Sequence, residues 1–550
     1  ALAATAVAAE EEFAPYVEGV AGLMAKMMSI TDEKLYSLRG RALECMGHMA
    51  IAVGKETFRP YFQQTMQCAC EGLTFDNTEL HEFAYAVFAN LAKVMEDEFS
   101  PCLTELVPHL LDVLKQDDGG ILERQAATQA EFGAFDDSDD EDENGNYVIQ
   151  VRTALLEAKK GAITAVGEIG AHCGAAFVPF LEQTVPLLQK AASNWHPLIK
   201  AEVADSFPSM VFPVIAAEHG GSIEWQKGDI ATASPIGAQT TAVLGVILKE
   251  LVELTKDDDK ETVGKACESI QKLIEMCGPH SLSMIANDCL ESVHALLTKS
   301  APCQISEEAE DGYGDDDDDH DSFMTSVCDL VGAFGRVMGV HFAQYLPQFL
   351  PPICSFAKSS RPTSDRAMAI GCLGELAQEL GEGIKDHWKS VFLPGILAGL
   401  GDEDHNVKRN AAFCAGACCE GLGEVAVPDY NVILQSVGQL FGIDHNISDT
   451  SAAAVDNACA CMARMIMASP NNMPVSQVLP VMLSKLPLKN DMTENETVYK
   501  CILGLLQMNN ADAMAQKAEI KRVFTEAIAE GSRVDDENKE KLKMALPALG

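Results

Sequence analysis

The feature that most limits the possible folds of this chain is an internal repeat. The stretch 36–54 aligns with 405–423 so that a basic residue, an alanine and two glycines share positions, and 364–381 follows the same pattern. Gly381 and Gly423 lie 42 residues apart. Sequence units that recur every roughly 20–50 residues bury their apolar faces mainly against neighbouring units, so the chain is expected to form a stacked array.

Each repeat reads as two helices. Several repeats open with an aromatic residue, any residue and a proline, as in Phe99-Ser100-Pro101 and Phe177-Val178-Pro179. Proline is tolerated in the first turn of a helix, and glycine suits the residue after the last turn. Two helices in roughly 40–47 residues are typical of HEAT repeats. We therefore predict an all-α fold, a single α-solenoid of about eleven helix pairs across residues 1–550.

The chain is strongly acidic, with a formal net charge of −42. Such a surface repels phosphates, which argues against direct binding of nucleic acid, and it attracts basic partners. Acidic loop insertions are predicted at 131–147 and 301–321, each between the two helices of a pair, because runs of like charge stay solvated. A further segment, 218–235, contains glycines and lacks a helical period, so it is predicted to be a mobile loop between repeats.

Several functional classes find no support in the sequence. It has no phosphate-binding glycine loop, no HExxH motif and no GxSxG motif, so the chain is not expected to be an enzyme. The 18 cysteines show no paired CxxC spacing and lie in apolar helical stretches, which indicates buried side chains and no metal site. No apolar run reaches roughly 18 residues, so no membrane span is expected. No cofactor is predicted.

Five stretches together resemble one known family, the importin-β-type karyopherins, which are nuclear transport receptors, and in particular the importin-4 subgroup. They are VRTALLEAKKGAITAVGEIG (151–170), SDRAMAIGCLGELA (364–377), NVKRNAAFCAG (406–416), AVDNACACMARMI (454–466) and LPLKNDMTENETVY (486–499). The likeness extends over essentially the whole chain, which is similar to the C-terminal half of such a receptor. The N-terminal repeats of a full-length receptor are then missing.

The resemblance implies nuclear import of cargo with basic localisation signals, such as core histones and ribosomal proteins, by a receptor that shuttles between cytoplasm and nucleus. It also implies binding of nucleoporin Phe-Gly repeats between outer helices by the full-length protein. The small GTPase Ran would be bound mainly through the missing N-terminal repeats.

In this subgroup basic tails lie on the inner surface, where lysines enter pockets of carboxylates, an asparagine and an aromatic ring. Carboxylates pair with an ammonium group, and an aromatic ring covers the lysine stem. On matching stretches the cargo-binding candidates are Glu375, Asn410, Phe413, Asp456, Asn457, Glu494 and Glu496. Additional candidates for a second pocket are Glu168, Asn194, Trp195, Glu202 and Asp205.

Two other functions stay open at this point. The chain could be a structural HEAT-repeat scaffold for folded partners, although such scaffolds usually lack acidic insertions. It could also be an acidic histone chaperone, which shares much of the chemistry of a carrier. Binding of an unfolded lysine-rich peptide would separate a carrier from a scaffold.

Overall fold

The structure is a computed structural model that describes residues 1–116, 119–123, 147–151, 153–229, 235–305 and 317–549. It divides into two compact units, each described by itself here. The first unit comprises Ala1–Glu224 and Pro235–Ile270, and the second comprises Trp225–Ser234 and Gln271–Gly550. The first predicted acidic insertion lies almost entirely outside the described residues.

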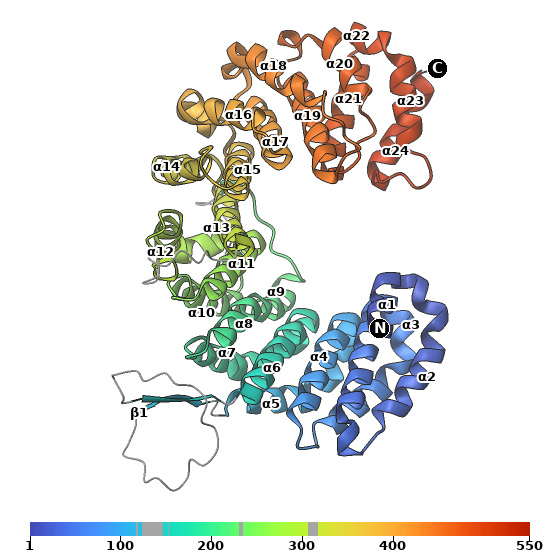
Figure 1. The fold of residues 1–550 in the computed structure, drawn as a ribbon, viewed down its shortest axis with the longest axis vertical. Helices are drawn as coiled ribbons and strands as arrows, with labels where there is room; N and C mark the ends of the chain where they lie inside the picture. The colour runs from blue at the N-terminus through green and yellow to red at the C-terminus, as the bar shows by residue number, and fades with distance from the viewer. Residues whose placement is uncertain (117–118, 124–146, 152, 230–234, 306–316, 550) are drawn as a thin grey trace. The chain divides into compact units, whose positions relative to one another are not determined.

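The helices of the first unit run in chain order along the blue and green part of the ribbon (Figure 1). They are α1 (Leu2–Ala9), α2 (Val17–Met28), α3 (Tyr36–Gly72), α4 (Thr78–Met95), α5 (Leu103–Leu114), α6 (Thr153–His172), α7 (Val178–Ala192), α8 (Pro197–Ser206), α9 (Phe212–His219), α10 (Ala238–Leu254) and the start of α11 (Lys260–Cys277).

The second unit takes the rest of α11 and all later helices. These are α12 (Pro279–Leu297), α13 (Asp317–Met338), α14 (Leu346–Phe356), α15 (Thr363–Leu380), α16 (Leu393–Leu400), α17 (His405–Leu422), α18 (Tyr430–Leu440), α19 (Asp449–Ala468), α20 (Val475–Leu483), α21 (Asn495–Gln507), α22 (Ala511–Ala515), α23 (Lys517–Ala527) and α24 (Asp536–Ala545).

Consecutive helices form pairs, in which we call the first helix A and the second B. Within the described residues eleven such pairs follow α1, from α2 with the first half of α3 to α23 with α24. In the second unit the B helices α13, α15, α17 and α19 line one side and the A helices α12, α14, α16 and α18 the other (Figure 1). The predicted α-solenoid of about eleven helix pairs is confirmed.

The glycines of the repeat end the B helices. Gly381 after α15 and Gly423 after α17 have φ angles of 53° and 51°, a conformation that favours glycine over residues with a Cβ. Gly54 takes the same role within α3, where φ is 73° and the chain bends from a B helix into the next A helix. Glu96 after α4 occupies the equivalent position with φ of 50° and carries a side chain there.

The aromatic residues before the prolines anchor the turn between repeats. Phe99 and Phe177 are fully buried in short 3-10 turns that precede α5 and α7. Pro179 stands in the first turn of α7, where its missing N–H is not needed. The repeat pattern therefore specifies both the bend and the packing that fixes it.

One feature of the fold is not helical. Two short antiparallel strands, β1 (Gly119–Glu123) and β2 (Tyr147–Val151), lie between α5 and α6, with Ile121 opposite Ile149. The second acidic segment is also shorter than the predicted 301–321, because α13 begins at Asp317. Both insertions fall between the A and the B helix of a pair.

In the second unit the helices α17 and α19 are packed largely through small residues. Every residue of α19 from Ser451 to Ile466 is buried, and ten of the eighteen residues of α17 are buried too. The free cysteines are buried throughout the chain except Cys70, Cys102 and Cys354. Small side chains allow neighbouring B helices to approach closely, which agrees with the interpretation of the cysteines as packing residues.

One described stretch, Ser322–Phe356, is long and apolar enough to cross a membrane by length and composition. Its most apolar window has a mean hydropathy of 1.3, and 78% of that window is buried within the fold. The stretch also bends at Gly339, where φ is 55°, between α13 and α14. Its apolar character is therefore explained by helix packing in the solenoid.

The segment 218–235, predicted as a mobile loop, makes specific contacts through its described residues. It begins inside α9, where Glu218 accepts hydrogen bonds from the N–H and the hydroxyl of Thr240 at the start of α10. Further along, Trp225 and Lys227 contact helices of the second unit. Residues 230–234 lie outside the described part.

Candidate functional site

A cavity of about 310 Å³ lies on the B-helix side of the second unit. It is lined by side chains of α13, α15, α17 and α19 and of the turn before α21: Thr325, Cys328, Asp329, Met368, Gly371, Cys372, Glu375, Arg409, Asn410, Phe413, Asn457, Asp491, Thr493 and Glu494. Four of these residues are carboxylates and one is a cation, so the lining has an acidic surplus.

Two glycines of α15 make room for the site. A Cβ at Gly374 would lie 2.7 Å from Cδ1 of Phe413, and a Cβ at Gly371 would lie 3.1 Å from Nδ2 of Asn410. Because neither glycine has a Cβ, both side chains of α17 can lie against the backbone of α15. The Nδ2 of Asn410 also donates to the carbonyl of Ala367 at 2.7 Å, which fixes the amide.

The carboxylates of the cavity differ in their state of ionisation. Burial, followed by the nearby charge of Asp329, raises the pKa of Glu375 from 4.5 to about 7. Within the described part of the chain, the Glu375 carboxylate makes no hydrogen bond or ion pair. Burial opposes the ionisation of Asp491, but hydrogen bonds from Thr493 and Asn457 and the charge of Arg409 outweigh it and lower the pKa.

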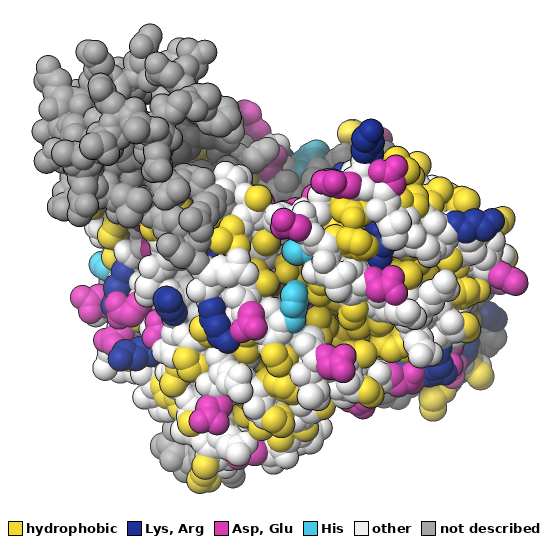
Figure 2. Space-filling view, turned by 90° about the horizontal axis from the view of Figure 1, so that it is seen from below, with side chains coloured by type: hydrophobic (Ala, Val, Ile, Leu, Met, Phe, Trp, Pro, Cys, Tyr) yellow, Lys and Arg dark blue, Asp and Glu magenta, His cyan; other side chains and the backbone are white. Residues whose placement is uncertain are grey.

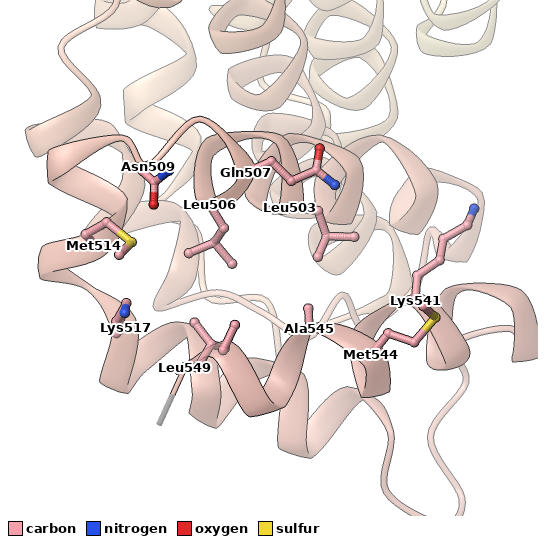
Figure 3. Close-up of a pocket in the computed structure, with 11 residues that line it drawn as sticks. Leu503, Leu506, Gln507, Asn509, Met514, Lys517, Lys541, Met544, Ala545 and Leu549 are labelled. Carbon is pink, nitrogen blue, oxygen red and sulfur yellow. The ribbon is translucent and has the colours of Figure 1, made fainter.

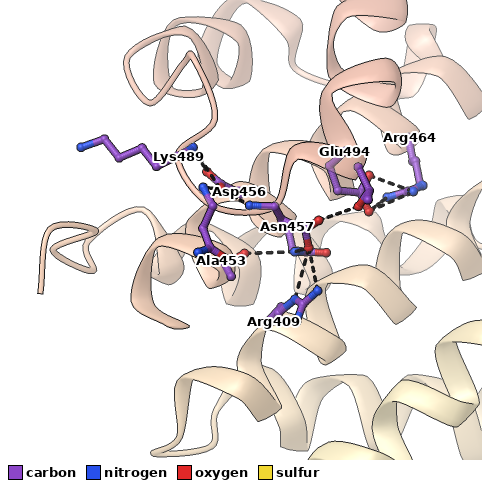
Figure 4. A network of polar contacts seen from close by, with 10 residues as sticks. Arg409, Ala453, Asp456, Asn457, Arg464, Lys489 and Glu494 are labelled. Carbon is purple, nitrogen blue, oxygen red and sulfur yellow. Dashed lines mark hydrogen bonds and ion pairs between the residues drawn. The ribbon is translucent and has the colours of Figure 1, made fainter. Parts of the chain in front are cut away.

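Two arginines of the chain neutralise two of the other three carboxylates (Figure 4). Nη2 of Arg409 lies 2.9 Å from Oδ2 of Asp491, and Nη2 of Arg464 lies 2.9 Å from Oε2 of Glu494. The guanidinium of Arg464 also lies 5.4 Å from the ring centroid of Phe413. A cation that enters the cavity therefore finds Glu375 without an ion-pair partner, whereas Asp491 and Glu494 are each paired with an arginine.

The structure brings five of the seven cargo-binding candidates to this cavity: Glu375, Asn410, Phe413, Asn457 and Glu494. Their role in binding stays a prediction. Sequence reasoning missed Asp329, Arg409, Asp491 and Thr493, which line the same cavity. Asp491 and Thr493 stand in the stretch that supplied Glu494, so its charge pattern could have pointed to them; no signal in the sequence marks Asp329.

The remaining two candidates lie outside the cavity. Asp456 is buried and its carboxylate accepts the backbone N–H groups of residues 489–491 at 2.7–3.2 Å, which holds the connection between α20 and α21 (Figure 4). Glu496 is exposed on α21, and its charge helps to raise the pKa of Lys541 in α24, after the larger effect of Glu537. Asp456 therefore has a structural role, which its sequence context did not indicate.

The second set of candidates lies in the first unit, where several of its members contact neighbouring side chains. Glu168 pairs with His172 at 3.2 Å, and Glu202 accepts a hydrogen bond from Thr164 at 2.5 Å. Burial raises the pKa of Glu202.

Trp195 packs edge-on against His196, with ring centroids 5.1 Å apart. Asn194 accepts the N–H of His196 and lines a cavity of about 270 Å³ that includes three lysines and no carboxylate. The charge of Asp205 contributes to the raised pKa of Glu202, after the larger effect of burial, and the predicted second pocket stays a prediction.

Other described cavities have a different chemistry. One of about 640 Å³ lies among α21–α24 and is lined by leucines, Met514, Met544 and two lysines, among others (Figure 3). Another, of about 490 Å³, lies between the A helices α14 and α16 and is lined mainly by leucine and proline. The described residues include no cluster that could hold a metal ion.

The acidic surplus of the chain does not form one continuous field on every face. Figure 2 shows a face on which Asp and Glu side chains are interspersed with Lys and Arg and with many apolar side chains. A local group of carboxylates, such as the one in the cavity, is therefore a better indicator of a site for a basic partner than the net charge of the chain.

No family model matches the chain. Among curated proteins it is 29% identical to the probable importin subunit β-4 of Schizosaccharomyces pombe over 96% of the chain and 50% of that protein. It is 24% identical to mouse importin-4 over the whole chain and 51% of that protein, and 21% identical to importin subunit β-3 of Saccharomyces cerevisiae. The chain thus spans about half the length of the curated relatives it matches.

Solved structures show the same fold. The karyopherin Kap121p bound to the SUMO protease Ulp1p has a TM-score of 0.68 at 16% identity over 99% of this chain and 51% of that one. Kap121p bound to Nup53p and Kap121p bound to RanGTP match with TM-scores of 0.65 and 0.66. The chain is thus similar over nearly all of its length to about half of an importin-4-type receptor, and its fold is that of the karyopherin Kap121p.

Proposed function

We propose that the chain is a cargo-binding part of a nuclear transport receptor, which holds lysine-rich segments of imported proteins on the B-helix side of its second unit. The observation that supports the proposal is the cavity, where Glu375 and Asp329 lie with the ring of Phe413 and two asparagine amides. Carboxylates, amides and an aromatic ring match the three parts of a lysine residue in a peptide: ammonium, backbone and aliphatic stem.

The hydrogen bonds within the cavity leave the amide oxygens of Asn410 and Asn457 and the carboxylate of Glu375 available to accept hydrogen bonds from a cargo peptide. The Nδ2 of Asn457 donates to Asp491 at 2.8 Å and to the carbonyl of Ala453 at 3.0 Å. The Nδ2 of Asn410 is held in the same way, so the amide oxygen of each asparagine is the group able to accept from a cargo N–H. The Glu375 carboxylate, without an internal partner, is the natural ligand for the ammonium.

The cargo class follows from this chemistry and from the family. Core histones and ribosomal proteins are rich in lysine and suit an acidic cavity of this size. By analogy with Kap121p, whose structures include complexes with Pho4p, Nup53p and RanGTP, nucleoporins and Ran are further proposed partners of the whole receptor. The receptor would then shuttle between cytoplasm and nucleus as a carrier and not as an enzyme.

The cavity between α14 and α16 is a candidate for the nucleoporin contact. It lies between A helices, on the side away from the proposed cargo site, and its lining includes Leu346, Leu350 and Pro394. An apolar groove of this kind can accept a phenylalanine side chain. Both partners could then bind at the same time.

The test is a titration of a lysine-rich histone-tail peptide against the chain at about 0.15 M salt, where exposed charges more than about 8 Å apart are largely screened. The variant carries Glu375→Gln and Asp329→Asn, which removes two charges and keeps the shapes. We expect its affinity to fall by about tenfold or more, because each charge-assisted hydrogen bond contributes about 1.5–3 kcal/mol.

The matched control carries Glu382→Gln and Asp386→Asn, which remove two exposed carboxylates that follow α15 and line no described cavity. It should bind the peptide almost as the unmodified chain does. Equal affinities of the two double variants would show that the cavity is not the site. Absence of peptide binding by the unmodified chain would contradict the carrier function itself.

The rival functions make different predictions in the same assay. A scaffold for folded partners should not bind an unfolded peptide at micromolar concentration. An acidic histone chaperone should bind intact histones more tightly than their tails and should tolerate the substitution of Glu375, since charge distributed over the surface would dominate.

A further inference from the structure

The segment Trp225–Asp229, which we call the strap, lies against the C-terminal ends of three B helices of the second unit. The indole Nε1 of Trp225 donates to the carbonyl of Glu275 in α11 at 3.0 Å. A Cβ on Gly278 would lie 2.4 Å from the indole ring, so the ring occupies space that only a glycine leaves open. The N–H of Gly228 donates to the carbonyl of Val337 in α13 at 2.8 Å.

The strap presents a lysine to a buried carboxylate. Nζ of Lys227 lies 2.5 Å from Oε2 of Glu379 in α15, and only 9% of the Glu379 side chain is exposed. Arg336 lies next to this pair, 3.5 Å from Glu379 and 2.5 Å from Glu275. A backbone hydrogen bond, an aromatic anchor and a lysine on a carboxylate are the contacts that an extended basic peptide would make.

This lysine subsite is continuous with the proposed cargo cavity. Glu379 follows Glu375 by four residues on α15, a rise of about 6 Å along the helix. An extended chain advances about 3.4 Å per residue, so lysines two positions apart can reach both carboxylates. The two carboxylates also influence each other electrostatically. The charge of Glu379 raises the pKa of Glu375, and the charge of Arg336 lowers it.

We infer that the strap is an internal ligand of the proposed cargo-binding surface, which fills the Glu379 subsite until a chain with a second, suitably spaced lysine takes its place. The inference rests on the proposed function and adds a selection by the number and spacing of lysines. A peptide with a single lysine binds the cavity beside the strap, whereas one with a second lysine two positions away gains the second subsite only after it displaces Lys227.

The experiment compares a hexapeptide of glycine with a single lysine, which can occupy only one carboxylate subsite, and a dodecapeptide of alternating lysine and glycine, which can occupy both. Their affinities are measured with the unmodified chain, with Lys227→Ala and with a control, Lys389→Ala. Lys389 forms a similar exposed ion pair with Asp429 at 2.5 Å, in the turn before α16, so its loss removes the same charge away from the strap.

We expect Lys227→Ala to raise the dodecapeptide affinity by about fivefold and the hexapeptide affinity much less, since a partly exposed ion pair has to be broken only for the longer peptide. Lys389→Ala should change neither by more than about twofold. Hydrogen exchange gives an independent result: saturating dodecapeptide should accelerate exchange of the Gly228 amide in the unmodified chain, and the hexapeptide should leave it protected.

The possible failures are distinguishable. If neither peptide binds the unmodified chain, the proposed function falls and the inference falls with it. If both bind while Gly228 stays protected and Lys227→Ala behaves like Lys389→Ala, only the inference is overturned.

Discussion

The raised pKa of Glu375 predicts that lysine binding at the proposed cargo site depends on pH in the physiological range. The free carboxyl has a pKa of about 7, because burial and Asp329 disfavour its charged form. An incoming ammonium group favours the charged form, so it binds tightly only to the ionised carboxylate and lowers its pKa. Binding of a lysine peptide should therefore release a proton and strengthen as the pH rises.

The size of the effect follows from the fraction of Glu375 that is ionised. With a pKa of about 7, roughly a tenth is ionised at pH 6 and roughly nine tenths at pH 8. The apparent affinity is the affinity of the ionised form multiplied by this fraction, so the dissociation constant should fall about tenfold from pH 6 to pH 8. Lysine itself does not titrate over this range.

The assay is a titration of a fluorescent lysine peptide without histidine, at constant salt, in steps from pH 6 to pH 8. Glu375→Gln serves as the control, because it keeps the shape and removes the titration. The lining of the cavity contains no histidine within the described residues, and the lowered pKa of Asp491 keeps that carboxylate ionised throughout.

The expected result is a steep pH dependence for the unmodified chain and a nearly flat one for Glu375→Gln. Equal slopes for the two proteins would refute the assignment of the proton to Glu375. A slope of opposite sign, with tighter binding at pH 6, would refute the argument that an ammonium group binds the charged carboxylate.

Three further predictions concern stability and are checked by chemical denaturation. Arg409→Ala should destabilise the chain by about 2 kcal/mol, because it leaves the largely buried Asp491 carboxylate without its cation; a loss below about 0.5 kcal/mol would contradict this. Asp456→Ala should cost about 3 kcal/mol, since the amides of residues 489–491 lose their acceptor, and these amides should then exchange faster. Glu96→Gly should stabilise by about 1 kcal/mol by relieving a φ of 50°, a gain that Glu96→Ala should not reproduce.

Much of the fold could be predicted because the same helix-start and helix-end signals recur in several repeats. The glycine that ends a B helix and the aromatic residue that opens the next repeat act locally, through backbone conformation and burial of one ring. The two strands between α5 and α6 and the contacts of Trp225 could not be predicted in this way. They depend on pairings with distant residues that no repeat duplicates.

The site was predictable only in part, for a related reason. Glu375, Asn410 and Phe413 are half-buried on B helices, and their chemistry can be judged from residue type. The role of Asp456 depends on three backbone amides that are more than thirty residues away in the sequence. The network that neutralises Asp491 and Glu494 also arises only when α17, α19 and the turn before α21 come together, so residue type alone could not separate structural from accessible carboxylates.

The cavity contains carboxylates paired with arginines, Asp491 and Glu494, and one without such a partner, Glu375. This division explains why the proposed acidic binding surface also contains arginines. Four carboxylates in one cavity would repel one another and partly protonate; Arg409 and Arg464 neutralise two of them and leave Glu375 in an unfavourable, buried state. That cost appears as pH dependence of stability. The unfolded carboxyl ionises near 4.5 and the folded one near 7, so stability should fall as the pH rises between these values and then level off.

The difference corresponds to about 3 kcal/mol at full ionisation. Glu375→Gln, which imitates the protonated form, should therefore unfold at higher denaturant than the unmodified chain at pH 8 and at nearly the same denaturant at pH 5, although it binds lysine peptides more weakly. Equal stabilities of Glu375→Gln and the unmodified chain at pH 8 would mean that the Glu375 carboxylate is well solvated. Its charge would then cost no stability, and pairing with a lysine would gain nothing from removing such a cost.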